Sequence, residues 1–392
     1  MRTPRDLHTG PVIGNAFNPK RNGLNLVRLV LATSVIFHHS FPLLGLPEAP
    51  RYFGDQMGGW AVVGFFCLSG YLITASRWGK DFGSYLSLRI ARIFPAFLLC
   101  LVVTVALFAP LNYLHVHGSL DGFFSTPTTP FAYVFVNSLL RMNAYDVAGT
   151  PLGVPYTGAW DGSLWSLYYE FLCYLIVGIL GLFTIFRRSA TPLLCAWALS
   201  VVLRMSVPRF APCYGAGIGD LELLSKLLPY FLAGGVLFTV RKRIGMHWGL
   251  AAISVVTATA ALNMSEYWGG QLASVPIAYL LMWIGSLLPS PELIRVHDVS
   301  YGMYIYGFLV QQLIVTYTGP AIGYWRFSLL AVLVTLVFAI ASWVMLERPV
   351  MMSVRRSAVL RGQATSSSLA APRPEFRTDD ASGPDQASGT AS

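Results

Sequence analysis

Long apolar runs, separated by shorter polar segments, dominate the chain. A membrane-crossing helix needs about 20 predominantly apolar residues, and runs of about this length lie at 24–44, 58–76, 93–110, 163–184, 191–207, 225–240, 248–264, 269–288, 299–318 and 325–346. The runs are continuously apolar and lack the period-two alternation of a transmembrane β-barrel. The pattern therefore predicts an all-α, polytopic membrane helix bundle of about ten transmembrane helices.

The composition agrees with this pattern. Of the 392 residues, 55% are hydrophobic and only 11% are charged, whereas soluble domains have about 25% charged residues. The net charge of +9 would suggest nucleic acid as a partner of a soluble protein. Here Lys and Arg stand mainly at the ends of apolar runs, where they orient membrane helices. We therefore expect contact with membrane lipids and none with nucleic acid.

The basic clusters predict the topology. If the N-terminus is cytoplasmic, alternate connections on the cytoplasmic side carry the basic residues, which are Arg77, Lys80, Arg89 and Arg92, then Arg187 and Arg188, then Arg241, Lys242 and Arg243, and finally Arg348, Arg355 and Arg356. Both termini are then cytoplasmic. We expect a cytoplasmic N-terminal segment (1–23), a membrane domain (24–350) and a polar, disordered cytoplasmic tail (351–392).

A long connection, 111–162, lies on the opposite side in this topology. It is rich in Gly, Pro, Thr, Tyr and Asn, and its apolar piece at 131–140 is too short to span a membrane. It is either a lid over a binding site or a plain exposed loop with an interfacial helix.

Two ionisable residues, Arg28 and His39, lie inside the first apolar run. Such groups are costly in a membrane and mark functional sites. Their offset of eleven residues is about three helical turns, so they share a helix face about 16 Å apart along the axis. His38 is rotated about 80° from Arg28, which favours His39 as the functional histidine.

Several segments resemble the acyltransferase-three family of integral membrane acyltransferases. They are LNLVRLVLATSVIFHHSF (24–41), GGWAVVGFFCLSGYLIT (58–74), YLSLRIARIFP (85–95), GSLWSLYYEFLCYL (162–175), VSYGMYIYGFLVQQ (299–312) and ERP (347–349). They run from the first apolar run to the last. The family's motif of an arginine, ten residues and a histidine falls on Arg28 and His39.

The resemblance implies an O-acyltransferase, most simply an O-acetyltransferase, of the bacterial inner membrane. Its donor substrate is cytoplasmic acyl-coenzyme A, with no tightly bound cofactor and no metal. Its acceptor is a hydroxyl of a cell-surface or periplasmic glycan or glycolipid, with polysaccharide-assembly proteins as candidate partners. Histidine suits the role of general base for this hydroxyl. His39 then has to be reachable by the thioester from one side and by the alcohol from the other.

Three arginines are candidates for donor binding. Arg28 is assigned to the nucleotide half of coenzyme A or to the donor tunnel, because a guanidinium binds phosphate in two-point fashion. Arg89 and Arg92, three residues apart and just before the apolar run at 93, could hold its phosphates. The alternative for all three is a topology-setting cation at a helix end.

Ser69, Gly70 and Tyr301 are candidates for the donor tunnel. Small residues in the second apolar run could leave room for the pantetheine arm, or they could simply allow close helix packing. Tyr301 could line the tunnel or belong to an aromatic belt at the membrane interface.

Glu170 lies in the fourth apolar run, where an unpaired carboxylate is costly. It could orient His39 or bind sugar hydroxyls, and it could instead hold a structural contact with Arg204. Its assignment here is catalytic, together with His39.

Two other functions compete with acyl transfer. One is a transporter or flippase for a glycan or lipid intermediate, in which His39, Glu170 and Arg204 relay protons. The absence of an inverted repeat and of clearly broken helices weakens it. The other is a structural scaffold in a polysaccharide-assembly complex.

Overall fold

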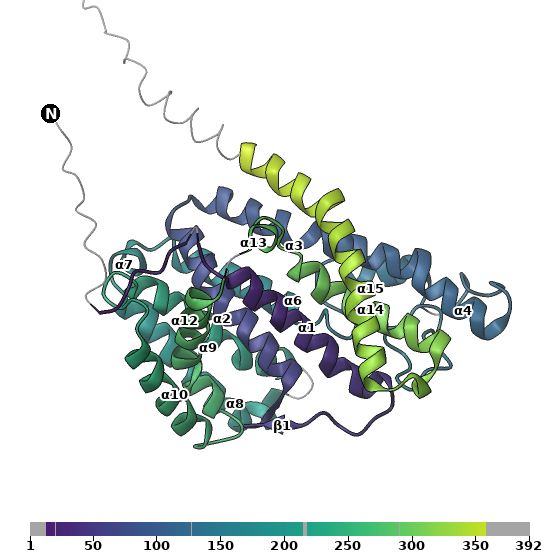
Figure 1. Cartoon of the computed structure of the whole chain (residues 1–392), viewed down its shortest axis with the longest axis horizontal. Helices are drawn as coiled ribbons and strands as arrows, with labels where there is room; N and C mark the ends of the chain where they lie inside the picture. Colours follow the sequence, from purple (N-terminus) through teal and green to yellow (C-terminus); the bar gives the residue numbers. More distant parts are fainter. Residues whose placement is uncertain (1–12, 20, 127, 215–217, 290, 358–392) are drawn as a thin grey trace, which may run out of the picture.

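The computed structural model describes residues 13–19, 21–126, 128–214, 218–289 and 291–357, without the side chains of 211–218. These residues form a helical bundle (Figure 1). Within the described residues, the bundle has one small sheet, the antiparallel hairpin of β1 (Arg51–Tyr52) and β2 (Asp55–Gln56). The predicted all-α class is confirmed.

The helices follow the chain in this order. The first half holds α1 (Leu24–Leu43), α2 (Met57–Trp78), α3 (Phe82–Val103), the π-helical η1 (Thr104–Phe108), α4 (Ala109–His117), α5 (Pro130–Asn137), α6 (Ser166–Leu180) and α7 (Thr184–Arg188). The second half holds α8 (Thr191–Tyr214), α9 (Ile218–Val240), α10 (Trp248–Leu262), α11 (Gly269–Leu272), α12 (Ser274–Leu287), α13 (Glu292–Val296), α14 (Ser300–Thr318), the 3-10 turn η3 (Pro320–Ile322), α15 (Tyr324–Ser342) and the π-helical η4 (Trp343–Glu347).

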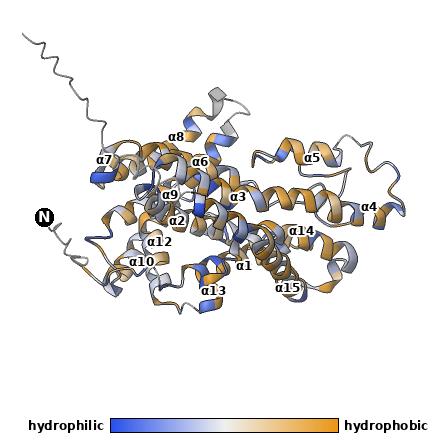
Figure 2. Ribbon diagram, turned by 90° about the horizontal axis from the view of Figure 1, so that it is seen from above, coloured by the Kyte–Doolittle hydropathy of each residue, from blue (hydrophilic) through white to orange (hydrophobic). Residues whose placement is uncertain are grey.

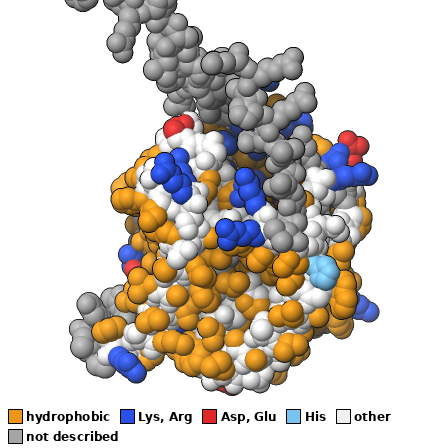
Figure 3. All heavy atoms as spheres, turned by 90° about the vertical axis from the view of Figure 1, so that its left-hand side faces the viewer, with side chains coloured by type: hydrophobic (Ala, Val, Ile, Leu, Met, Phe, Trp, Pro, Cys, Tyr) orange, Lys and Arg blue, Asp and Glu red, His pale blue; other side chains and the backbone are white. Residues whose placement is uncertain are grey.

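Six helices in the described residues are long and apolar enough to cross a membrane, and three shorter apolar helices, α6, α10 and α12, accompany them. Apolar residues predominate on α3, on its continuation α4 and on α15 (Figure 2). On the face drawn in Figure 3, most Lys and Arg side chains lie near one end, above a broad apolar surface. The chain is therefore a membrane protein, and the count of about ten crossings stays a prediction.

Helix α14 lies at the centre of one half of the bundle, between α1 and α15 (Figure 1). Most of its side chains are buried, including the polar Gln311 and Gln312. Each amide nitrogen donates to backbone carbonyls, Gln311 to Ile36 of α1 (2.9 Å) and Gln312 to Ala159 (2.8 Å). Buried amides need such partners, so α14 ties α1 to the segment that precedes α6.

Several helices extend beyond the apolar runs that predicted them. The run at 93–110 belongs to one continuous helix from Phe82 to His117, which Asp81 caps by accepting from the Ser84 backbone N–H at 2.8 Å. The run at 325–346 belongs to a helix from Tyr324 to Ser357. Hydropathy marks the part of a helix suited to lipid, whereas the backbone hydrogen bonds continue past it. The disorder predicted for the tail 351–392 is therefore wrong for 351–357, which continue this helix. Residues 358–392 lie outside the described residues.

The ends of the described chain lie at one end of the bundle. Asn25 of α1 and Arg355 near the end of the last helix line the same cavity. Residues 13–15 bridge to 244–246, directly after α9. This arrangement is what an even number of crossings requires, and the side of the membrane on which these ends lie stays a prediction.

Candidate active site

A large cavity of about 1080 Å³ opens at the end of the bundle where α1 begins. Its walls come from the α2–α3 connection, the first turns of α3, the residues around α13 and the helical continuation of α15. Its charged lining residues are Lys80, Arg89, Arg92, Arg295, Arg348 and Arg355, with Asp81 and Asp298. The excess of cationic groups makes this cavity suited to an anionic ligand.

An ion-pair cluster lies at the inner edge of this cavity. Asp298 Oδ2 binds Arg28 at 2.6 Å and Arg92 at 2.7 Å, and Arg92 also binds Glu347 at 3.1 Å. Burial opposes the ionisation of Asp298, but Arg28, Arg92 and hydrogen bonds from Ser300 lower its pKa to about 2. Two guanidinium groups thus face two carboxylates, and their charges cancel within the cluster.

The two arginines predicted to bind the donor phosphates, Arg89 and Arg92, therefore have different surroundings. Arg92 faces the cavity with its charge already neutralised by Asp298 and Glu347. Arg89, also in the lining, has no ion pair among the described residues, and its buried Nε lacks a hydrogen-bond partner. A buried donor without a partner is costly, so Arg89 is the member of the pair that is available to a ligand.

A second, small cavity of about 30 Å³ lies deeper in the bundle, between α1, α2, α6 and α14. Arg28, Glu170 and Tyr301 all line it, and Ser69 donates to Glu170 Oε1 at 2.7 Å. Four of the predicted site residues therefore converge on this chamber. Because Arg28 lines the small cavity and its partner Asp298 lines the large one, the ion-pair cluster separates the two.

Glu170 takes its hydrogen bonds from neighbours in the bundle. Ser69 and the Tyr174 hydroxyl (2.6 Å) both donate to Oε1, and Oε2 accepts from no described residue. The alternative given for Glu170, a structural contact with Arg204, does not form, because Arg204 stacks on Tyr267, 3.6 Å from the ring centroid, and pairs with Glu222 at 3.7 Å. The proton relay of the transporter interpretation therefore lacks this contact, and no hydrogen bond joins Glu170 to His39 among the described residues.

Tyr301 and its neighbour Tyr304 are interior residues. Both are buried and line the small cavity. The Tyr301 hydroxyl donates to the Ile93 carbonyl (2.8 Å), and the Tyr304 hydroxyl donates to the Ser163 carbonyl (2.6 Å). These contacts place both rings in the bundle interior and not in an interfacial belt.

Arg28 and His39 occupy one face of α1, as their spacing predicted. Arg28 binds Asp298, just before α14, and the His39 ring lies against Phe308 of the same helix, with centroids 5.0 Å apart. His38 packs instead on Gly58 of α2, where an added Cβ would clash with the imidazole. Helices α1 and α14 therefore run in the same direction, and their shared contact face carries the motif.

His39 lies apart from the other predicted residues. It lines neither cavity and makes no hydrogen bond with the described residues, and the residue as a whole is half-buried. Phe308, which contacts it, follows Tyr304 by about one helical turn. Tyr301, Tyr304 and Phe308 thus form a stripe on α14 that leads from the small chamber towards His39.

Gly70 differs from its neighbour Ser69. A Cβ at Gly70 would clash with the Phe231 carbonyl of α9, and one at Gly234 would clash with the Cys67 carbonyl of α2. The two glycines let the α2 and α9 backbones meet. Gly70 therefore lies in a helix–helix contact and lines neither cavity, which favours the packing alternative for this residue.

The sequence predicted no role for Asp298, and Glu347 entered only as part of the ERP motif. Both are acidic residues at the edge of apolar runs, Asp298 directly before the VSYGMY string and Glu347 opening ERP. The signal that could have found them was the need of Arg28 and Arg92 for counter-charges. Their partners are about 200 to 270 residues away in sequence, beyond the reach of local patterns.

Comparisons with known proteins agree over most of the chain. The sequence model of a family described as "Acyltransferase domain" matches residues 21–345. An O-acetyl transferase of Shigella phage Sf6 is 29% identical over 344 residues, covering 84% of this chain and 96% of the relative. Nodulation protein 10 of Rhizobium leguminosarum bv. viciae is 26% identical over 376 residues, covering 87% and 96%. No solved structure matches the chain.

Proposed function

Because this chain belongs to the acyltransferase domain family, we propose that it moves an acyl group, most simply acetyl, from acyl-coenzyme A to a glycan hydroxyl. The donor comes from the cytoplasm and the acceptor is a cell-surface or periplasmic glycan or glycolipid, with the protein in a bacterial inner membrane. The observation that carries the proposal is the cationic cavity next to the chamber lined by Arg28, Glu170 and Tyr301.

The donor enters with its phosphates in the large cavity. Arg89 supports this role, because its guanidinium has no ion pair among the described residues and faces the cavity. A guanidinium forms strong two-point hydrogen bonds with phosphate oxygens. Arg92 and Arg28 hold the inner edge of the cavity through Asp298.

The pantetheine arm then passes the ion-pair cluster and enters the small chamber. Glu170 Oε2, which accepts from no described residue, suits an amide N–H of this arm. The chamber of about 30 Å³ is too small for the arm as it stands, so donor binding requires the side chains of its lining to move. The stripe of Tyr301, Tyr304 and Phe308 guides the thioester towards His39.

The chemical step is the attack of the acceptor hydroxyl on the thioester carbonyl. His39 takes the hydroxyl proton as the oxygen forms its bond to the carbonyl carbon. The carbon–sulfur bond then breaks, and the imidazolium returns the proton to the departing thiolate. The products are an acylated glycan and the free thiol of coenzyme A, and His39 regains its neutral form.

The test uses the full-length protein in lipid nanodiscs, with radiolabelled acetyl-coenzyme A and candidate surface glycans. We expect label on the glycan, and a loss of at least about 100-fold in rate for His39→Ala, because general-base catalysis contributes about 10²–10⁴. His38→Ala is the matched control, since the neighbouring imidazole packs on Gly58. Glycan movement without a donor, or a His39→Ala rate within twofold of wild type, would overturn the proposal.

A further inference from the structure

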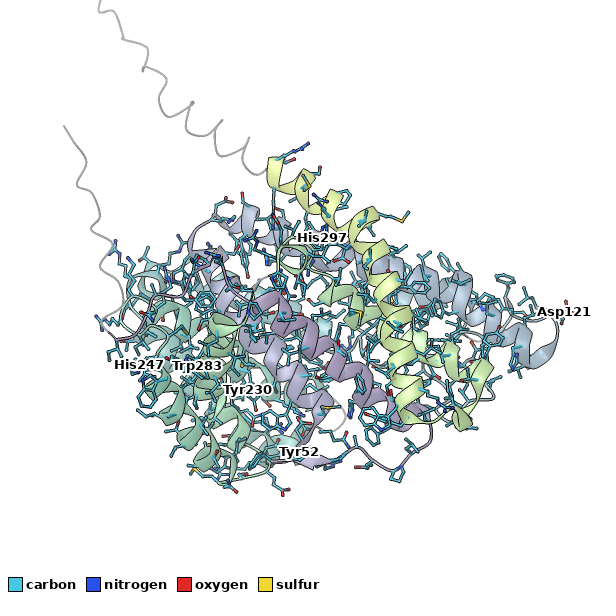
Figure 4. The ribbon with its side chains drawn as sticks, in the orientation of Figure 1. Tyr52, Asp121, Tyr230, His247, Trp283 and His297 are labelled. Atoms are coloured by element: carbon cyan, nitrogen blue, oxygen red, sulfur yellow. The ribbon has the colours of Figure 1, made fainter. Side chains whose placement is uncertain are left out.

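The helical continuation of α15 forms one wall of the large cavity. The helix runs for 34 residues from Tyr324 to Ser357, or roughly 51 Å at 1.5 Å per residue. A hydrocarbon core is about 30 Å thick, so the helix is longer than one crossing needs, and its last turns form a projection at the end of the bundle that holds the large cavity. Trp343 anchors the base of this projection by donating to His297 Nδ1 at 3.1 Å, and Figure 4 shows His297 close to this helix.

One face of the projection points into the cavity. Its lining residues are Arg348, Met351, Met352 and Arg355, at the spacing of three and four residues that defines a single helix face. The neighbouring Arg356 is exposed and is not part of this lining. The matched family region ends at residue 345. Of this wall only Arg348 belongs to a segment that resembles the family, ERP (347–349).

Four cations that line the cavity have no ion-pair partner within the part of the chain that the structure describes, although the Asp81 carboxylate also lines the cavity. Lys80, Arg89, Arg348 and Arg355 form no ion pair among the described residues, and Asp298 in the same lining is already bound by two arginines. Arg355 lies close enough for its charge to act on Arg89. Like charges held together repel, and a bound anion with several negative groups would relieve this repulsion.

The cations lie at different depths in the cavity, and these depths predict which group of the bound anion each cation contacts. Arg89 has a buried Nε and lies on α3 beside the inner ion-pair cluster, whereas Arg355 is exposed at the rim. A donor that inserts its pantetheine arm first brings its pyrophosphate to the inner cations. The ribose, which carries the remaining phosphate and the adenine, stays at the rim.

We propose that Arg355, with Arg348 beside it, binds the ribose 3′-phosphate of coenzyme A, while Met351 and Met352 pack against the adenine. This assignment rests on the proposed function, in which acyl-coenzyme A is the donor. Two-point guanidinium–phosphate contacts suit such a role, and flexible methionine side chains adapt to a flat base. The end of the last helix thereby selects a donor that bears this phosphate.

The test measures the affinity of coenzyme A and of 3′-dephospho-coenzyme A by titration calorimetry, with the full-length protein in phosphatidylcholine nanodiscs. Wild type should bind coenzyme A at least tenfold more tightly than the dephospho form. Arg355→Gln should weaken coenzyme A binding by about the same factor and leave dephospho-coenzyme A unchanged. Arg356→Gln, which alters the same charge on an outward-facing neighbour, should behave as wild type.

In phosphatidylcholine nanodiscs, three results would overturn the assignment: equal affinities of wild type for both ligands, equal weakening of both ligands by Arg355→Gln, or equal effects of Arg355→Gln and Arg356→Gln. Two kinds of molecule carry a phosphate that Arg355 can bind, namely coenzyme A and an anionic lipid. Repeating the titration in nanodiscs that contain anionic lipid distinguishes them. Discrimination that disappears in anionic lipid means that a lipid headgroup occupies Arg355, which contradicts the assignment. Binding is measured without turnover, so failure of glycan acylation refutes the proposed function separately.

Discussion

Replacing Asp298 with Asn should destabilise the protein, because this carboxylate holds two arginines together. Asp298 is 17% exposed and accepts from Arg28 and Arg92 at 2.6 and 2.7 Å. The interactions lower its pKa from the ordinary 3.8 to about 2. Each pKa unit is worth about 1.4 kcal/mol, so the ionised form is favoured by about 2 kcal/mol in the native state. Removing one partner of a buried ion pair costs about 3–5 kcal/mol, and we expect a loss of about 2–4 kcal/mol.

The same carboxylate predicts a pH dependence. Because the folded-state pKa of Asp298 lies below its unfolded value, the stabilisation is fully present above about pH 4. It is lost as the pH falls through this value towards about 2. The difference in stability between wild type and Asp298→Asn should therefore shrink over this interval.

Reversible unfolding of the protein in mixed micelles, followed by tryptophan fluorescence, measures these changes. The double variant Arg28→Gln/Asp298→Asn removes both partners of one ion pair. It should be at least about 1 kcal/mol more stable than the sum of the two single losses predicts, because contacting residues couple. If the single losses add without coupling, or if Asp298→Asn costs less than about 0.5 kcal/mol, the ion-pair cluster does not stabilise the bundle.

Three further variants test other parts of the site. Arg89→Gln should raise the KM for acetyl-coenzyme A about tenfold with little change in kcat, since a charge-assisted hydrogen bond is worth about 1.5–3 kcal/mol; initial rates at varied donor concentration measure this, and an unchanged KM would contradict phosphate binding. Glu170→Gln should raise the donor KM without shifting the pH profile of kcat, whereas a shifted profile would make it a partner of the base. Gly70→Ala should destabilise the protein by about 1–3 kcal/mol through its clash with α9. Gly79→Ala is its control, because a Cβ there makes only ordinary contacts, and equal unfolding curves for the two variants would refute the close α2–α9 contact.

The fold could be predicted as far as local patterns determine it. Apolar runs predicted the helices, and an offset of eleven residues correctly predicted that Arg28 and His39 share a face of α1. Helix ends were less predictable. Arg89 and Arg92 lie well inside α3, because a helix continues past the point at which its side chains cease to be apolar.

The candidate site was predictable residue by residue, but its arrangement was not. Ser69 and Gly70 are neighbours in the same motif, yet one donates to Glu170 on α6 and the other packs on α9. Successive residues of a helix point about 100° apart, so the position of each neighbouring helix decides their roles. The sequence had offered both the tunnel and the packing interpretation for this pair.

The amino-acid sequence by itself determined a helical membrane protein, the shared face of Arg28 and His39, and the family. These features depend on hydrophobicity, helical period and motifs, which are properties of contiguous residues. Only the tertiary structure decided that Asp298 and Glu347 neutralise Arg92, whereas Arg89 has no ion pair with any residue that the structure describes. It also decided that the end of the last helix faces the cationic cavity. Such contacts join residues far apart in the chain, and the free energy of helix packing selects them.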